Sequence, residues 1–374
     1  MKKVAFLFLF GFSAIIAQSN SPIKQDSLIS SFEVHLDSSI SNGGGAGLAI
    51  AIVKEKDIIF RKAYGYRSLQ DSTLIDFETS FRIASLSKGF AGILAGMLTK
   101  DSLFNLNDKV AKYLPNLRLK DSSSTAELNI RHLLSHTTGV VPHAYDNLIE
   151  HNIPFDRILP QLEKAKIICA PGECYGYQNV LFSLIANIVD TAAGKSYQQL
   201  LYEKIIYPLG MINVSVDKDE FFATDNYALP HVSVDSVWTE VKMRDTYYSM
   251  TPASGINASL NDMIKWTFAL LGNQPKVIDP KVLEEVFTPI IETPYERRRF
   301  DWNGKLTRTS YGLGWRIFEY SGKKMIYHSG GLRGYRSKIA LIPEEKLGIV
   351  ILQNSSFEQD FIHEFLDLYL ENQE

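Results

Sequence analysis

The chain has 374 residues, of which 45% are apolar and 22% are charged, and its formal net charge is −3. This composition is typical of a soluble globular protein with a large core, organised as one large domain or two interlocked ones. Because basic residues are not in excess, the composition argues against nucleic acid as a partner.

The N-terminus has the pattern of a processing signal. Lys2 and Lys3 precede an apolar run over residues 4–17, which is too short to span a bilayer comfortably. Ala17 is a small residue followed by polar ones, as at a cleavage site. We therefore expect residues 1–17 to be a signal peptide and the mature protein to be periplasmic or secreted, with no stable membrane span after processing. An uncleaved anchor is the alternative.

Strands are predicted near both ends of the chain and helices between them. A helix is predicted over Ser27–Ile40, followed by a β-hairpin with strands Gly47–Val53 and Ile58–Tyr64. From Ser85 to about Pro294 the helical period dominates. The helices predicted in this part are Ile130–Leu134, Val180–Ala193, Tyr197–Tyr207 and Asp262–Leu271; the strands predicted after it are Lys324–Ser329, Arg336–Ile342 and Gly348–Leu352; and Phe357, Phe361, Phe365 and Leu368 indicate a terminal amphipathic helix.

This order of elements predicts an α+β fold. One antiparallel sheet is built from both chain ends and covered by helices, and a large helical insertion lies beside it. We expect residues 18–374 to form a single catalytic domain, with a sheet part over 25–84 and 305–374 and a helical part over 85–304.

The first candidate for chemistry is the pair Ser85 and Lys88. Residues three apart on a helix share one face, so the Lys88 amine can reach the Ser85 hydroxyl. A serine hydroxyl becomes a good nucleophile when a neighbouring base takes its proton, and a lysine can do this if burial keeps it neutral part of the time. The run Gly89–Leu98 is apolar almost all round, which predicts that the helix is buried. The alternative is an ordinary solvated helix face.

A second candidate pair, Tyr177 and Asn179, lies just before the helix predicted from Val180. Side chains at such a position can point into a cleft. The pKa of a tyrosine is near 10, so a tyrosine acting as a base needs nearby cations that stabilise its phenolate. The alternative is a structural role.

Three other groups have structural explanations. Cys169 and Cys174 flank a turn, and the sequence leaves open whether they form a disulfide or remain thiols. His132 and His136 are four residues apart, as two zinc ligands on a helix would be, but the Glu of a metalloprotease helix is missing, so we expect structural histidines. The charge run Arg297–Arg299 is expected to be a solvated loop.

With the third motif, His328-Ser329-Gly330-Gly331, the sequence resembles the serine β-lactamase and penicillin-binding superfamily. The three motifs occur in that superfamily's order and approximate spacing, and Tyr177-x-Asn179 resembles the class C branch with its DD-peptidases and esterases. The resemblance extends roughly from Gly47 to Asn354. Four further stretches also resemble that branch: His132–Gly139, Tyr207–Met211, Tyr311–Trp315 and Gly334–Ser337.

The resemblance implies a role for each motif residue. Ser85 would be acylated, and Lys88 and Tyr177 would share the work of base and acid. Asn179 would bind Lys88 and the substrate. The backbone N–H groups of Ser85 and Gly331 would form an oxyanion hole. The resemblance implies an acyl-enzyme hydrolysed by water, with no metal and no cofactor.

The third motif also implies a place in the substrate cleft. His328, Ser329, Gly330 and Gly331 would lie on a sheet-edge strand that lines it. The partner would be a small-molecule or peptide ester or amide, and the sequence indicates neither the physiological substrate nor the oligomeric state.

One residue departs from the pattern of the superfamily. The lactamases and many DD-peptidases carry Lys-Thr-Gly in the third motif, where this chain has His328-Ser329-Gly330. The change removes a fixed cation, although Arg333 or Arg336 could substitute for it. We therefore expect an esterase or a D-amino-acid peptidase or amidase. The alternatives are a β-lactamase or D-alanyl-D-alanine carboxypeptidase, and a penicillin-binding or sensor protein without turnover.

Overall fold

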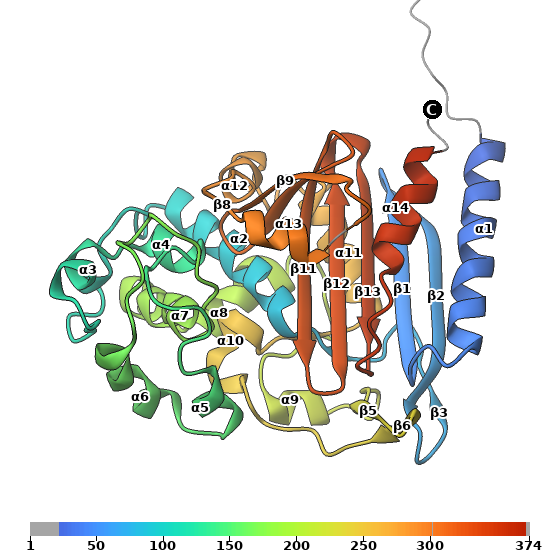
Figure 1. The fold of residues 1–374 in the computed structure, drawn as a ribbon, viewed down its shortest axis with the longest axis horizontal. Helices are drawn as coiled ribbons and strands as arrows, with labels where there is room; N and C mark the ends of the chain where they lie inside the picture. The colour runs from blue at the N-terminus through green and yellow to red at the C-terminus, as the bar shows by residue number, and fades with distance from the viewer. Residues whose placement is uncertain (1–21, 301, 372–374) are drawn as a thin grey trace, which may run out of the picture.

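A computed structural model describes residues 22–300 and 302–371 of the chain. Its centre is a nine-stranded antiparallel sheet with the strand order β3-β2-β1-β13-β12-β11-β10-β9-β8 (Figure 1). Because β1 pairs with β13, the two chain ends meet in the middle of the sheet. The strands are β1 (Gly47–Lys54), β2 (Asp57–Ser68), β3 (Thr73–Leu74), β8 (Ile291–Glu292), β9 (Leu306–Tyr311), β10 (Arg316–Tyr320), β11 (Lys323–Leu332), β12 (Tyr335–Ile342) and β13 (Leu347–Gln353).

The sheet is buried on both faces, as the strand sequences explain. β1 is apolar at almost every position, and alternate side chains of a strand point to opposite faces. Ala49 and Ala51 belong to one hydrophobic core, while Leu48 and Ile50 belong to a second. A strand without the polar alternation of a half-exposed sheet therefore predicts helices on both sides.

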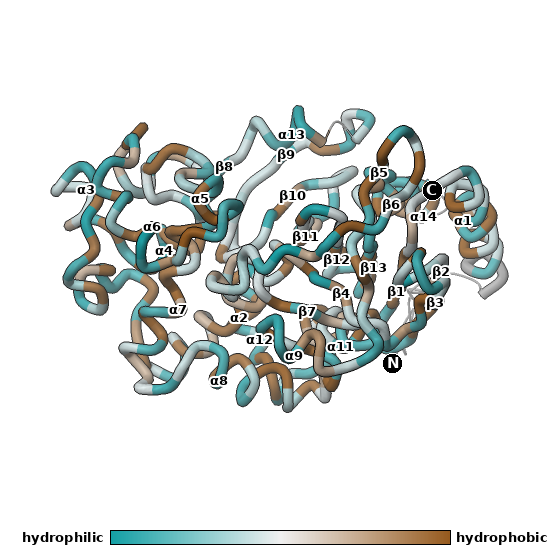
Figure 2. Tube along the Cα trace, turned by 90° about the horizontal axis from the view of Figure 1, so that it is seen from below, coloured by the Kyte–Doolittle hydropathy of each residue, from teal (hydrophilic) through white to brown (hydrophobic). Residues whose placement is uncertain are grey.

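Two terminal helices cover one face of the sheet, α1 (Pro22–Ser41) and α14 (Phe361–Glu371) (Figure 1). Phe32 and Phe365 meet edge to face, with ring centroids 5.2 Å apart. Figure 2 shows polar and apolar residues mixed along α1 at the margin of the molecule, as expected for a helix with one buried stripe.

The opposite face carries α2 (Ser87–Lys100) and α11 (Leu260–Leu270). Phe90 of α2 stacks on Trp266 of α11, with centroids 4.0 Å apart, and α11 packs against β1 and β13. The other helices lie in several places, most of them beyond α2 and the rest close to the sheet (Figure 1). They are α3 (Ser122–Glu127), α4 (Ile130–Leu134), α5 (Asp146–Glu150), α6 (Phe155–Ile158), α7 (Val180–Ala193), α8 (Tyr197–Leu201), α9 (Lys218–Phe222), α10 (Thr251–Ser254), α12 (Pro280–Val286) and α13 (Pro294–Phe300).

The predicted α+β class and the sheet made from both chain ends are confirmed. The stretch 85–304 is less uniformly helical than its sequence predicts. It contains the hairpin β5 (His231–Val234) and β6 (Val237–Glu240), and β7 (Asn257–Ala258), which pairs with β4 (Phe81–Arg82). It also supplies β8 to the main sheet and α11 to its face, so the two parts interlock; the predicted division at 85 and 304 stays a prediction.

The predicted helix over 197–207 is shorter. α8 ends at Leu201, and a single π-type turn continues to Ile206. Within the described residues no helix combines the length and the apolar character needed to cross a membrane. The predicted signal peptide, residues 1–17, lies outside the described part of the chain.

Candidate active site

Ser85 lies in a tight 3₁₀ turn, Ala84–Leu86, directly before α2. It is partly exposed, whereas its neighbours in the sequence are buried. Ala84 has a left-handed backbone with φ of 50°, which is rare for a residue with a side chain and is found most often at functional sites. The sequence predicts that Ser85 opens a helix, and the structure places it in the 3₁₀ turn, two residues before the α-helix begins at Ser87.

The turn is held against β11 and β12. A Cβ on Gly330 would lie 2.5 Å from the Ile83 carbonyl oxygen and 3.0 Å from the Ala84 Cβ, so only glycine fits there. The Ser337 hydroxyl donates to the same Ile83 oxygen at 2.7 Å. The third motif therefore positions the Ser85 turn by direct packing.

The Lys88 amine is fully buried and has only neutral partners among the described residues. Nζ lies 3.5 Å from Ser85 Oγ, 2.7 Å from Asn179 Oδ1 and 2.9 Å from the Ala253 carbonyl oxygen. Burial holds the pKa of Lys88 well below its usual value; the charge of Asp146 opposes this shift and that of Arg316 reinforces it. A neutral amine can donate to Asn179 and Ala253 and keep its lone pair for the Ser85 proton.

Tyr177 and Asn179 come from the loop before α7, as predicted. Asn179 donates through Nδ2 to Asp146 Oδ2 at 2.8 Å. The Tyr177 ring centroid lies 4.6 Å from Lys88 Nζ. Burial raises the pKa of Tyr177 to about 12, against the opposing effects of Arg316 and of a hydrogen bond with Ser85. Tyr177 is therefore a neutral phenol at pH 7, a proton donor and not a standing base.

The third motif occupies the end of β11. This strand lies inside the sheet, between β12 and β10, so the prediction of a sheet-edge strand is wrong, but at its end one edge is free of a strand partner. The pairing of β10 with β11 ends at Arg316 and Tyr327, while the pairing with β12 continues to Leu332. The edge left by β10 contacts the Ser85 turn. Ser329 is partly exposed and Gly331 is exposed, so this edge can offer backbone groups to a ligand.

The ring of His328, in contrast, is fully buried. Its Nδ1 lies 2.9 Å from the Ser329 carbonyl oxygen, and its Nε2 lies 3.1 Å from the Tyr311 hydroxyl and 3.4 Å from Arg316 Nη1. A proton on Nδ1 leaves Nε2 as an acceptor for these donors. Burial, with Arg316 and Lys88, holds the pKa of His328 well below its usual value, so the ring is neutral.

Arg316 is a site residue that the sequence reasoning missed. It is buried, and its Nε pairs with Glu296 Oε1 at 2.7 Å. Its guanidinium carbon lies 5.6 Å from the centroid of the Tyr177 ring. A fixed cation thus stands close to the phenol although the third motif carries no lysine. The sequence feature that could have identified Arg316 is its position directly after the apolar stretch Tyr311–Trp315.

The two arginines that the sequence offered as substitutes lie further along the β11–β12 hairpin. Arg333 is exposed. Arg336 pairs with Glu358 at 2.7 Å, and its Nη1 would lie 3.3 Å from a Cβ on Gly331. Arg336 is therefore beside the exposed end of the third motif, at Gly331. Arg316 is buried and lies beside the other end, at His328.

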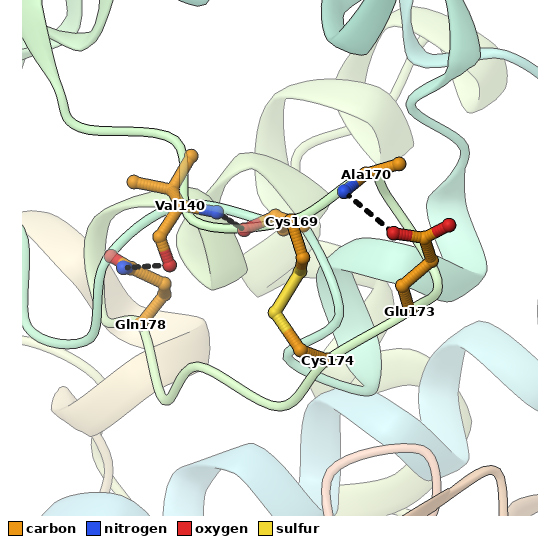
Figure 3. The surroundings of a disulfide bond; sticks show 7 residues. Val140, Cys169, Ala170, Glu173, Cys174 and Gln178 are labelled. Atoms are coloured by element: carbon orange, nitrogen blue, oxygen red, sulfur yellow. Dashed lines mark hydrogen bonds between the residues drawn. A yellow bond between two sulfur atoms is a disulfide. The ribbon is translucent and has the colours of Figure 1, made fainter.

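A disulfide joins Cys169 and Cys174, which the sequence left undecided, in the loop that leads to Tyr177 (Figure 3). Figure 3 shows Glu173 turned back to accept from the Ala170 N–H, at 3.1 Å. His136 anchors the same loop, since its Nδ1 accepts from the Gln178 N–H at 3.1 Å and its ring lies 4.3 Å from that of Tyr177.

The other two candidate groups have structural surroundings. His132 Nδ1 accepts from the Asn129 N–H at the start of α4, at 3.4 Å, while His136 faces the Tyr177 loop, so the two rings serve different contacts. The described residues contain no group of three or more potential ligands that could hold a metal ion. Arg297–Arg299 are exposed as expected, but they lie on the helix α13 and not in a loop, so that part of the prediction is wrong; Arg297 donates to the Thr307 carbonyl oxygen at 3.0 Å.

This chain is similar to a known protein family and to several curated proteins. The model of the family described as Beta-lactamase matches residues 33–369. "Protein flp" of Staphylococcus aureus is 24% identical over 332 residues, which cover 86% of this chain and 62% of the relative. "Unguisins hydrolase ungD" of Aspergillus violaceofuscus is 25% identical and is covered over 59% of its length. The chain thus spans about three fifths of the curated relatives that it matches.

Two solved structures share the fold. The octameric penicillin-binding protein homologue from Pyrococcus abyssi superposes with a TM-score of 0.81 at 23% identity, covering 92% of this chain and 78% of that one. EstCE1, described as a hydrolase with promiscuous acyltransferase activity, gives a TM-score of 0.76 at 17% identity, covering 92% and 99%. At these identities the likeness concerns the fold alone.

Proposed function

Because this chain belongs to the beta-lactamase family, we propose that it is an exported serine hydrolase that forms an acyl-enzyme on Ser85 and hydrolyses an ester or an amide. The observation that carries the proposal is the buried Lys88 amine, whose hydrogen-bond partners in the described part of the chain are all neutral and which lies beside a partly exposed serine. A lysine kept neutral in this way is suited to accept a serine proton.

The reaction follows from the protonation states. Lys88 accepts the proton of Ser85 as Oγ bonds to the substrate carbonyl carbon, and the free edge of β11 receives the developing oxyanion through the Gly331 N–H, together with that of Ser85. Tyr177 donates its proton to the leaving oxygen or nitrogen as that bond breaks, and Lys88 returns its proton to Tyr177. Water then hydrolyses the acyl-enzyme: its proton passes to the neutral Lys88 amine as its oxygen bonds to the acyl carbon. The bond between Ser85 Oγ and the acyl carbon then breaks, and Ser85 Oγ takes the proton back from Lys88.

The substrate class is an ester, or an amide of the D-amino-acid peptidase or amidase type. Two similar proteins, unguisins hydrolase ungD and EstCE1, are described as hydrolases, and they support hydrolysis in general. The buried, neutral ring of His328 supports substrates that need no cation in the third motif. A periplasmic or secreted location is supported by the N-terminal pattern and agrees with the Cys169–Cys174 disulfide, since disulfides persist in oxidising compartments.

A β-lactamase or D-alanyl-D-alanine carboxypeptidase is the second candidate. One observation favours it: Arg336 lies next to Gly331, where its guanidinium could meet the carboxylate of such a substrate. A charge-assisted hydrogen bond of this kind contributes roughly 1.5–3 kcal/mol. A rate comparison between p-nitrophenyl butyrate, a D-amino-acid anilide and nitrocefin separates the two candidates, and a preference for nitrocefin would favour the second.

Labelling with a serine-directed fluorophosphonate tests the nucleophile. We expect the wild-type protein to gain the mass of one phosphonyl group and to hydrolyse p-nitrophenyl butyrate, and Ser85→Ala to do neither while keeping its circular dichroism. Ser122→Ala, which changes an exposed serine on α3, is the matched control and should behave as wild type. If Ser85→Ala is still labelled at one serine, the nucleophile lies elsewhere. Labelling without steady turnover would instead indicate a sensor.

A further inference from the structure

Asn179 is held at both ends of its side-chain amide. Its Oδ1 lies 2.7 Å from Lys88 Nζ, and its Nδ2 lies 2.8 Å from Asp146 Oδ2. These three residues come from α2, from α5 and from the start of α7, so the contacts are tertiary ones. The Asp146 side chain is mostly buried, and its other oxygen, Oδ1, is buried without a hydrogen-bond partner among the described residues.

The two ends of the amide are not chemically equivalent. A carboxylate only accepts hydrogen bonds, so the end of Asn179 that meets Asp146 must be the NH₂ group. The oxygen end then necessarily faces Lys88 and accepts from the amine. With the amide turned over, its NH₂ group would donate to the lone pair of a neutral Lys88, and that lone pair would no longer be available to Ser85.

We infer that Asp146 is a positioning residue for the proposed reaction: it fixes the orientation of the Asn179 amide and thereby keeps the lone pair of Lys88 directed at Ser85. The inference rests on the proposed function, since it assumes that Lys88 is the base. It adds a residue that none of the three sequence motifs contains.

The charge surroundings of Asp146 and Lys88 lead to a second consequence. Asp146 Oδ2 also meets His143 Nδ1 at 2.8 Å, and the charge of Asp146 acts on Tyr247 from the neighbouring loop. On the other side, the charge of Arg316 acts on Lys88. Arg316 and protonated Lys88 both lower the pKa values of His136 and His328.

Asp146 is the negative charge that favours protonated Lys88, while Arg316 disfavours it. Removing the charge of Asp146 therefore lowers the pKa of Lys88 and extends the neutral amine to lower pH.

Two variants separate orientation from charge. Asp146→Ala removes the acceptor, and we expect kcat for p-nitrophenyl butyrate to fall roughly 10²-fold, the usual effect of misplacing a catalytic group, with KM little changed. Asp146→Asn keeps an acceptor oxygen, so its loss of kcat should be smaller, and the acid limb of its pH profile of kcat/KM should move to lower pH. Asp156→Asn, which removes an exposed charge on α6, is the matched control and should change neither quantity.

The outcomes are distinguishable from failure of the proposed function. If the wild type is neither labelled at Ser85 nor active, the proposed function fails. If the wild type is active but both Asp146 variants stay within about twofold of it, well below the 10²-fold effect, the positioning role is overturned. An unmoved acid limb in Asp146→Asn would overturn the second consequence, the effect of the Asp146 charge on the pKa of Lys88. Thermal unfolding of each variant shows whether a loss of rate merely follows a loss of folded protein.

Discussion

Two buried basic side chains lie near Tyr177, and their surroundings differ. Lys88 Nζ meets an amide oxygen, a backbone carbonyl and a hydroxyl, all of them neutral. Arg316 Nε meets the carboxylate of Glu296 in a pair that is almost wholly buried. Burial disfavours the charged form of both, but Glu296 compensates for this at Arg316 and raises its pKa well above the usual value, whereas the pKa of Lys88 falls.

The difference shows how a protein can give two buried basic groups opposite tasks. A carboxylate in direct contact keeps a cation charged, while neutral partners satisfy the hydrogen bonds of an amine without holding its proton. Arg316 is thus a fixed charge beside the Tyr177 phenol, and Lys88 is a group that can gain and lose a proton. Arginine suits the first task because it stays protonated at any pH a protein tolerates.

The largest effect should come from removing the proton-carrying ability of Lys88. Lys88→Arg keeps a long basic side chain, but an arginine stays protonated and cannot accept a proton near pH 7, so we expect kcat/KM for p-nitrophenyl butyrate to fall by about 10²–10⁴-fold. Lys88→Met, which has a similar length and no charge, should lose as much. Lys100→Arg, on the exposed end of the same helix, is the control. Activity within tenfold of wild type in both Lys88 variants, below the span for a positioned base, would remove Lys88 from the role of base.

The second prediction breaks the buried ion pair. Glu296→Gln leaves Arg316 charged and without its carboxylate, and breaking such a pair typically costs roughly 3–5 kcal/mol of the free energy of unfolding. Glu292→Gln is a matched control on the adjacent segment, because Glu292 pairs with Arg308 at 2.6 Å where both side chains are exposed. There the loss should stay below about 1 kcal/mol. Urea unfolding measures both, and equal losses would show that Glu296 has no special role.

The third prediction concerns the loop that holds Tyr177 near Lys88 and Arg316. Cys169→Ser with Cys174→Ser opens a short loop with a sequence separation of 5, and the chain-entropy estimate for so short a loop is roughly 2 kcal/mol of the free energy of unfolding. His136 still anchors Gln178, so we expect turnover of p-nitrophenyl butyrate to fall less than in the Lys88 variants. If turnover falls as far as in those variants, the disulfide and not His136 positions Tyr177.

Most of the correct fold predictions came from local sequence patterns. The helix Val180–Ala193 and the strands β1, β12 and β13 appear within about two residues of their expected bounds, because apolar periodicity and turn residues report local conformation directly. The hairpin β5–β6 was missed, since its strands are short and largely exposed and leave little periodicity to detect. The helix expected over 197–207 ends early because the chain passes into a π-type turn that no sequence signal marks.

The sequence by itself determined the spacing of Ser85 and Lys88, the presence of Tyr177 and Asn179 before a helix, and the strand on which the third motif lies. All of these depend on residues a few positions apart, whose relative placement the backbone geometry sets. Only the tertiary structure decided which charges surround them. Asn179 lies 91 positions from Lys88, Asp146 lies 33 from Asn179, and Glu296 lies 20 from Arg316. Whether a buried lysine is charged or neutral depends on partners at such separations, because electrostatic interactions act through space and not along the chain.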